Sequence, residues 1–157
     1  MKKARSLISV LAIFILSALV FSEVYSKKEV LSTAVTLNAS TTVVNGAGGV
    51  TWYDVTLPSS VSPIIGVTMT FTRAAGSDST VQAFFQVSFD AGTTWSDLEG
   101  QELSVATNHV VISGTTVRVT EMLAVYGVNR LRVKHFINND GANNVTALQL
   151  TVTLERR

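Results

Sequence analysis

The sequence predicts an all-β fold: a single antiparallel β-sandwich of the jelly-roll or immunoglobulin-like kind, preceded by a hydrophobic N-terminal segment. Apolar and polar residues alternate with a period of two through most of the chain after Lys28, as they do in half-buried strands. The alternating segments are short, recur about every ten residues, and are separated by turns rich in Gly and Asn. No long amphipathic helical pattern follows the N-terminal segment.

Four strands are expected in the first half of this region. The alternating residues of segment 30–37 share one face: Leu31, Thr33, Val35 and Leu37. Segments 41–44 and 50–57 follow on either side of a glycine-rich turn. Segment 64–73 aligns four apolar residues on one face, with threonines opposite: Ile65, Val67, Met69 and Phe71. Each of these patterns is typical of a strand with one buried face.

Segment 80–89 is the clearest strand of the second half. Its apolar residues share one face: Val81, Ala83, Phe85, Val87 and Phe89. The remaining expected strands are shorter or lie nearer the C-terminus: 95–98, 103–106, 110–112, 115–120, 130–137 and 145–154. Segment 122–126 fits either a strand or a short helical turn.

The N-terminal segment, residues 1–26, has the pattern of an export signal. A basic start precedes the apolar run Leu7–Phe21, and a polar stretch follows it. The run is short for a bilayer span, which needs about 20 residues. We expect cleavage after Ser26, which leaves residues 27–157 as one domain that is secreted or displayed at the cell surface. Two alternatives stay open: a retained membrane anchor over 7–25, or a helix that packs with its copies in a filament.

Composition narrows the classes of function. The chain has no cysteine, so the expected domain relies on packing rather than on disulfides. Without residues 1–26 its charge is close to neutral, which argues against a nucleic-acid-binding protein. Only 15% of the residues are charged, and Thr, Ser, Asn and Gln are expected to cover much of the surface. Motifs that hold a metal or a nucleophile are absent, so we predict no enzyme and no cofactor.

The most specific local motif is Ser88-Phe-Asp90-Ala-Gly92-Thr-Thr94-Trp95. It resembles the Asp-box, S-x-D-x-G-x-T-W, of sialidase propellers and other exported β domains. In that family the box is a structural hairpin that lies away from the catalytic site, so the resemblance implies a fold element and no sialidase activity. From the residues themselves we expect Asp90 to accept backbone hydrogen bonds, Gly92 to adopt a positive φ, and Trp95 to cap the sheet edge.

Alternating cations define a candidate contact surface. Arg130, Arg132 and Lys134 are expected on one face of segment 130–137, with Leu131, Val133 and His135 on the other. The cations could grip an anionic glycan or the acidic face of a neighbouring subunit. They could also form a solvated face paired with acids such as Glu155. Trp52 and Trp95 complete the candidate surface, although Trp52 could instead belong to the core.

The N-terminal strand of the expected domain is a candidate for donation to a neighbouring copy. Its apolar residues would pair with the open sheet edge of the next subunit: Val30, Leu31, Val35 and Leu37. The alternative is that this segment pairs within its own sheet. Asn38 and Asn144 each begin an N-glycosylation sequon.

These features predict an exported, non-enzymatic structural protein that assembles with itself into a filament, pilus or surface layer. Such a subunit resembles cysteine-free fibre or virion β-sandwich subunits in architecture. A carbohydrate-binding module and a virion structural protein are the alternatives. The expected partners are other copies of the chain and, in the second case, glycans; no nucleic acid is expected, and a membrane only through 7–25 if that segment is retained.

Overall fold

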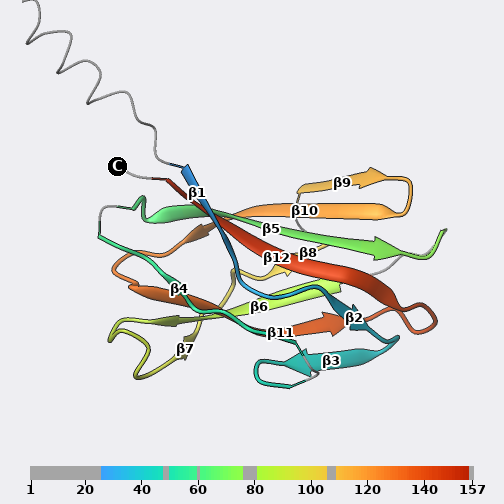
Figure 1. The fold of residues 1–157 in the computed structure, drawn as a ribbon, viewed down its shortest axis with the longest axis horizontal. Coiled ribbons are helices and arrows are strands. Elements are labelled where there is room, and N and C mark those ends of the chain that lie inside the picture. The colour runs from blue at the N-terminus through green and yellow to red at the C-terminus, as the bar shows by residue number, and fades with distance from the viewer. Residues whose placement is uncertain (1–25, 48–49, 60, 76–80, 106–108, 156–157) are drawn as a thin grey trace, which may run out of the picture.

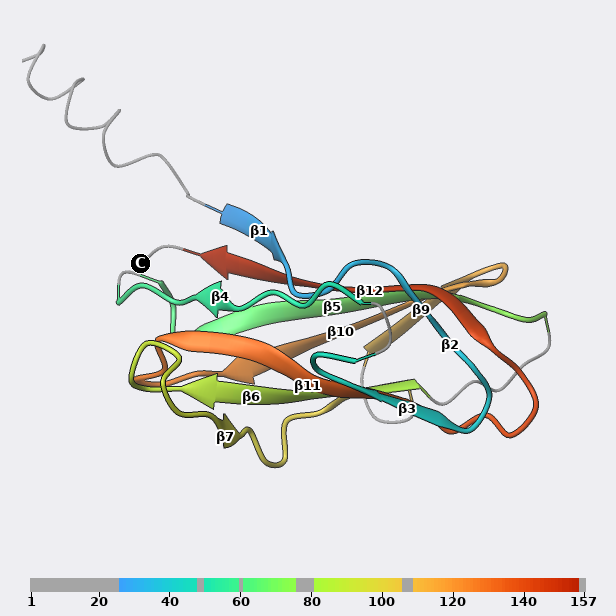
Figure 2. The same ribbon diagram turned by 60° about the horizontal axis from the view of Figure 1, so that its bottom comes forward.

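The computed structural model describes residues 26–47, 50–59, 61–75, 81–105 and 109–155 (Figure 1). Apart from Ser26, the predicted leader lies outside these ranges. Within them, no helix is long and apolar enough to cross a membrane. The described chain forms two antiparallel sheets packed face to face, which makes it a β-sandwich (Figure 2).

The first sheet has five strands in a row, with a sixth beside them. Its order is β1 (Ser26–Val30), β12 (Val145–Glu155), β5 (Ile64–Arg73), β10 (Thr116–Ala124) and β9 (His109–Ser113). The short β2 (Val35–Leu37) also pairs with β12. β5 has the limits that the alternation predicts. β10 runs on through most of the ambiguous segment 122–126, so that segment is mainly strand.

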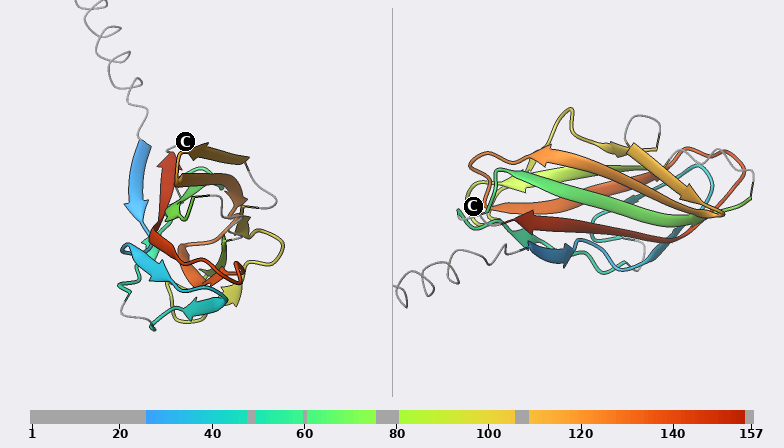
Figure 3. Two further views of the ribbon diagram at one scale, coloured as in Figure 1. Left: turned by 90° about the vertical axis from the view of Figure 1, so that its right-hand side faces the viewer. Right: turned by 90° about the horizontal axis from the view of Figure 1, so that it is seen from above.

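The second sheet is built around two long central strands. Its order is β3 (Thr41–Val44), β11 (Arg130–Asn138), β6 (Val81–Ser88) and β7 (Ser96–Asp97). β4 (Val55–Thr56) pairs with β11, and β8 (Leu103–Ser104) pairs with β6. Consecutive strands therefore alternate between the sheets at several points, and the end-on view in Figure 3 shows the two layers curling around a common interior.

The core lies between the two sheets and follows the predicted faces closely. Phe71 on β5, Phe85 on β6 and Phe136 on β11 are fully buried. Facing rows of β-branched and leucine side chains fill the space around them, because paired residues of antiparallel strands share a face. Segments 30–37 and 50–57 are less regular than predicted. The first divides into β1 and β2, and only Val55–Thr56 of the second is a strand.

Two facing predictions are wrong. The pairing of β11 with β6 shifts between Val133 and His135, which is a β-bulge. The bulge turns His135 to the outer face, where its ring lies 4.6 Å from that of Phe84, and places Phe136 in the core instead. Phe89 was expected on the buried face of β6, but β6 ends at Ser88 and the Phe89 side chain is 60% exposed.

Candidate functional site

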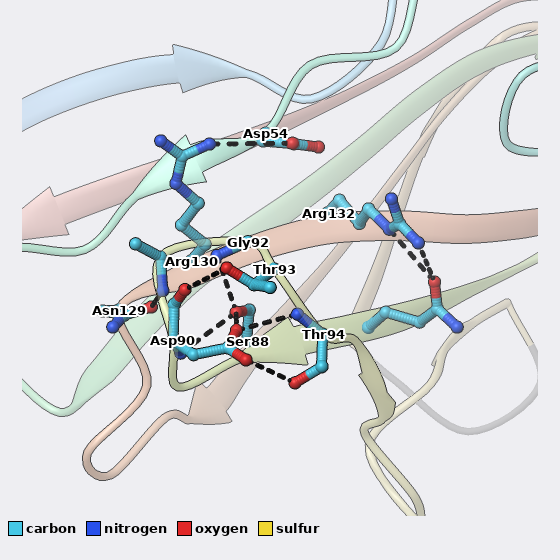
Figure 4. Close-up of polar contacts among 11 residues, drawn as sticks. Asp54, Ser88, Asp90, Gly92, Thr93, Thr94, Asn129, Arg130 and Arg132 are labelled. Carbon is cyan, nitrogen blue, oxygen red and sulfur yellow. Dashed lines mark hydrogen bonds and ion pairs between the residues drawn. The ribbon is translucent and has the colours of Figure 1, made fainter.

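The predicted hairpin follows β6 and is closed by the side chains of Ser88 and Asp90 (Figure 4). The Ser88 hydroxyl is buried; it donates to Asp90 Oδ1 at 2.7 Å and accepts from the Gly92 N–H at 2.8 Å. Asp90 also accepts from the N–H and the hydroxyl of Thr94, at 2.8 and 2.7 Å. Gly92 has a φ of +94°, as a turn at this position requires. These contacts give the turn the geometry expected from its residues; the Asp-box resemblance itself stays a prediction.

Asn129 ties the hairpin to the turn before β11. Its side-chain oxygen accepts from the Ala91 N–H at 3.1 Å, and its side-chain nitrogen donates to the Phe89 carbonyl at 2.8 Å. Its backbone N–H donates to the Ser88 carbonyl. Sequence reasoning did not single out Asn129, because nothing local marks a side chain whose partners lie about 40 residues earlier in the chain.

Hydrogen bonding also sets the charge of Asp90. The N–H of Thr94, the Thr94 hydroxyl and the Ser88 hydroxyl all donate to its carboxylate and lower its pKa from 3.8 to about 2. Asp90 is therefore ionised at any pH above strongly acidic values. Its hydrogen-bonding capacity is directed back into the turn, which makes it a structural group.

The predicted cations lie on the outer face of the second sheet, as expected. Arg132 donates two hydrogen bonds to Gln86 Oε1, at 3.0 and 2.8 Å (Figure 4). Its guanidinium also lies over the Trp95 ring, 4.0 Å from the ring centroid. This cation–π contact covers one face of the indole.

Lys134 and Arg130 are paired with acids, although not with the one suggested by the sequence. Lys134 donates to Asp97 Oδ2 at 2.5 Å, and Gln86 donates to the other oxygen of Asp97. The Lys134 and Gln86 hydrogen bonds lower the pKa of Asp97. Arg130 lies 3.9 Å from Asp54. Glu155 ends β12 on the first sheet, and the acids that pair with Arg130 and Lys134 are Asp54 and Asp97.

The structure separates Trp52 from the other candidate contact residues. Its ring stacks on the buried Phe136, with centroids 5.4 Å apart, and its indole N–H points to the Ala47 carbonyl at 3.4 Å. Phe136 is on the inner face of β11, whereas Arg132 and Trp95 are outside. Trp52 is half-buried and packs against the core.

His135 shares the outer face with Lys134. Burial against neighbouring side chains, and to a lesser extent the charge of Lys134, lower its pKa. Among the described residues, no three His, Cys, Asp or Glu side chains lie close enough to hold a metal ion. The outer face of the second sheet is thus a set of mutually paired polar groups, suited to holding one another in place.

Three of the four N-terminal strand residues named as donor-strand candidates lie inside their own sandwich. Leu31, Val35 and Leu37 are buried, and Val30 is partly exposed on β1. β1 and β2 both pair with β12 of the same chain, which is the alternative to donation. Both sequon asparagines are exposed. The Asn144 side-chain oxygen accepts from the Ala39 N–H at 2.9 Å, so this side chain also joins two turns.

A cleft of about 480 Å³ opens between β1 and the segment that leads into β4. Just beyond it, residues 31–33 and 51–53 pair across the two sheets, through the Ser32–Trp52 bridge and the Tyr53 N–H to Leu31 carbonyl bond. The two segments then diverge, β1 toward β12 and β4 toward β11. Val55 and Leu154 line the cleft together with the exposed Tyr53. No sequence motif marks this cleft, because it arises from the divergence of two strands.

The end of the sandwich where β1 begins and β12 finishes is here called the terminal end (Figure 1). There Ser62 donates to the Glu155 carbonyl and Val125 to the Pro63 carbonyl, which ties the loop before β5 to the end of β12 and to the loop after β10. A second cleft of about 340 Å³ lies among these loops. The uncovered side chains at or next to this end are Ile64, Phe89, Met122 and Tyr126.

Comparison with known proteins does not place this chain in a family. No family model matches the sequence, and no curated protein matches it. Among solved structures, the chain is similar to one in a structure of infectious bursal disease virus, Gx strain, with 10% sequence identity and a TM-score of 0.46. The match covers 84% of this chain and only 32% of the viral one. At this identity and TM-score, the likeness carries no argument about function.

Proposed function

We propose that this protein is an exported, non-enzymatic structural subunit that assembles with copies of itself. The observation that carries the proposal is the set of exposed apolar side chains at or next to the terminal end. Half of the large apolar side chains that are exposed in the described part of the chain lie there, and Tyr126 is 67% and Phe89 60% exposed. Apolar side chains gathered on one surface are typical of a protein contact site. The polar groups elsewhere on the second sheet are occupied with one another.

The strand order supports a finer assignment of the fold. The row β1-β12-β5-β10 in one sheet and β3-β11-β6-β7 in the other is the arrangement of two Greek keys in a jelly roll. Of the two sandwich types expected from the sequence, the jelly roll therefore fits better. Jelly rolls occur in viral capsid proteins and in lectins, so the order also keeps a virion structural protein as a second candidate. That step is an analogy of fold, and function must be argued from surfaces.

Sedimentation velocity and negative-stain electron microscopy of the full chain test the proposal. We expect concentration-dependent oligomers or filaments. The double substitution Phe89→Ser with Tyr126→Ser should weaken assembly, whereas Ile112→Ser, on a comparably exposed residue of β9 away from this end, should leave it unchanged. A wild-type chain that stays monomeric at every concentration would contradict the proposal, and retention on a polysaccharide column would then favour a carbohydrate-binding module.

A further inference from the structure

β1 is an edge strand, and its unpaired side is regular. It is the last strand of the first sheet and lies at the margin of the sandwich in both views of Figure 3. The Leu31 N–H donates to the Leu150 carbonyl, in the same register as the β1–β12 ladder. Because hydrogen-bonded pairs alternate along an antiparallel ladder, the backbone groups of Lys27 and Glu29 point to β12. Those of Ser26, Lys28 and Val30 point away from β12.

The charges of β1 alternate between its two faces. Lys27 and Glu29 lie opposite Leu154 and Val152, whose side chains are buried, so both are on the inner side and border the cleft. There they form an ion pair with each other. Lys28 and Val30 lie on the other side of the strand, opposite Thr153 and Thr151, although Val30 also borders the cleft. An edge strand thus carries a cation and an anion two residues apart on the same face.

We infer that this edge is a two-fold interface with a second copy of the chain, in which the two β1 strands pair antiparallel about Lys28. This inference rests on the proposed self-assembly and names the surface. Residues opposite one another in a sheet share a face, so a two-fold pairing can be centred on residue 27, 28 or 29. The first choice sets Lys27 against Lys27 and the third sets Glu29 against Glu29. Only the second sets Lys27 of each copy against Glu29 of the other.

The same register also satisfies the backbone. Centring on Lys28 sets the outward-pointing N–H and C=O groups of Lys28 against those of Lys28 in the other copy, and this pairing is present in a chain that begins at Lys27. Where Ser26 is retained, it lies opposite Val30 in the same register. Lysine on an edge strand ordinarily discourages pairing of this kind. In this register Lys27 lies opposite Glu29 of the other copy, so its charge is neutralised. Only Lys28 lies opposite a lysine, and there solvent screens the repulsion. The pairing would also bring the two clefts together and cover Val30 and Tyr53.

A two-fold contact closes on itself and stops at a dimer. A filament therefore needs a second surface, and the terminal end provides one. The β1 edge would then form the dimer, and the terminal end would link one dimer to the next.

Cysteine cross-linking tests the register directly, because the chain has no cysteine of its own. In the full chain, Lys28→Cys should form a disulfide-linked dimer on mild oxidation, since Cα atoms in a hydrogen-bonded pair are about 5.5 Å apart, within disulfide range. Thr42→Cys is the matched control. Thr42 is exposed on the edge strand β3 and its backbone also points away from its neighbour, since the flanking Asn45 N–H bonds to Lys134. Equal cross-linking of the two variants, or none in Lys28→Cys while wild type assembles, would overturn the inference.

Charge exchange tests the Lys27–Glu29 contact. Lys27→Glu and Glu29→Lys should each weaken dimerisation by about tenfold, because each places like charges opposite one another twice. Mixing the two variants should restore a heterodimer, because the opposite charges then face each other again. Unchanged association of either variant, or no recovery on mixing, counts against the interface. A wild-type monomer would instead remove the proposed function itself.

Discussion

The β6–β7 hairpin and the β1–β4 cleft use their polar groups in opposite ways. At the hairpin, Ser88 and Asp90 direct their hydrogen bonds into the turn, and Asn129 joins it to the next strand. At the cleft, β1 and β4 diverge, and the backbone groups of Lys28 on β1 point away from β12. The polar groups of the hairpin bind one another, whereas the edge of β1 leaves groups available for another chain.

This difference predicts which substitutions should lower the free energy of unfolding and which should alter assembly. A buried hydroxyl with several partners cannot be removed without leaving those partners unsatisfied, so changes at the hairpin should lower the free energy of unfolding. Side chains around the β1–β4 cleft are more exposed and make fewer contacts in the isolated chain. Changes there should alter assembly more than stability.

The largest effect on stability is expected at Ser88. Ser88→Ala removes a buried hydroxyl that serves Asp90 and the Gly92 N–H, and should lower the free energy of unfolding by about 2 kcal/mol. The matched change at the β1–β4 cleft is Thr56→Ala, at an exposed residue of β4, and it should stay within about 0.5 kcal/mol. Urea denaturation followed by tryptophan fluorescence measures both. Equal costs would remove the contrast between the hairpin and the cleft.

A smaller effect is expected at Gly92. Gly92→Ala forces a side chain onto a residue with φ of +94° and brings Cβ to 3.1 Å from Arg130 Cδ. We expect a loss of about 1–2 kcal/mol. Gly100→Ala separates the two causes, because Gly100 also has a positive φ, +69°, but nothing lies within 4 Å of the added Cβ. Gly92→Ala should cost more than Gly100→Ala, and Arg130→Ala should reduce the difference. If the glycines respond equally, contact with Arg130 plays no part.

The strands and the hairpin were predictable because their causes are local. Alternation along 64–73 reports which face is buried, and Ser88, Asp90 and Gly92 contact one another within a few residues. The position of Trp52 was left open by the sequence for a related reason. Whether an aromatic ring faces solvent or core depends on what the other sheet places opposite it, here Phe136.

The features that sequence reasoning missed depend on distant pairing. The bulge in β11 inserts one extra residue, Lys134, against β6, and nothing in the local sequence indicates a bulge there. The acids that pair with Arg130 and Lys134 are Asp54 and Asp97, and both lie far from β11 in the sequence. The β1–β4 cleft exists only because two segments leave a common bridge for different sheets. Information of this kind lies in the topology and cannot be read from a window of the chain.

The smallest of these effects is expected from the Asp90 charge, because its carboxylate lies at the surface, where solvent screens it. Its pKa falls from 3.8 to about 2 on folding, so the charged form stabilises the folded state at every pH above about 4. This contribution should decrease as pH drops below 3.8 and be gone below pH 2. Asp90→Asn cannot titrate, so its stability should change less than that of wild type between pH 4 and 2.

Urea midpoints at pH 5, 3 and 2 would measure the dependence in both proteins. Asp97, whose pKa is also lowered, titrates in the same direction and remains in both, so the difference between the two curves isolates Asp90. If Asp90→Asn lost stability between pH 5 and pH 2 as steeply as wild type, the acid sensitivity would not come from the hydrogen-bonded carboxylate of the closed turn.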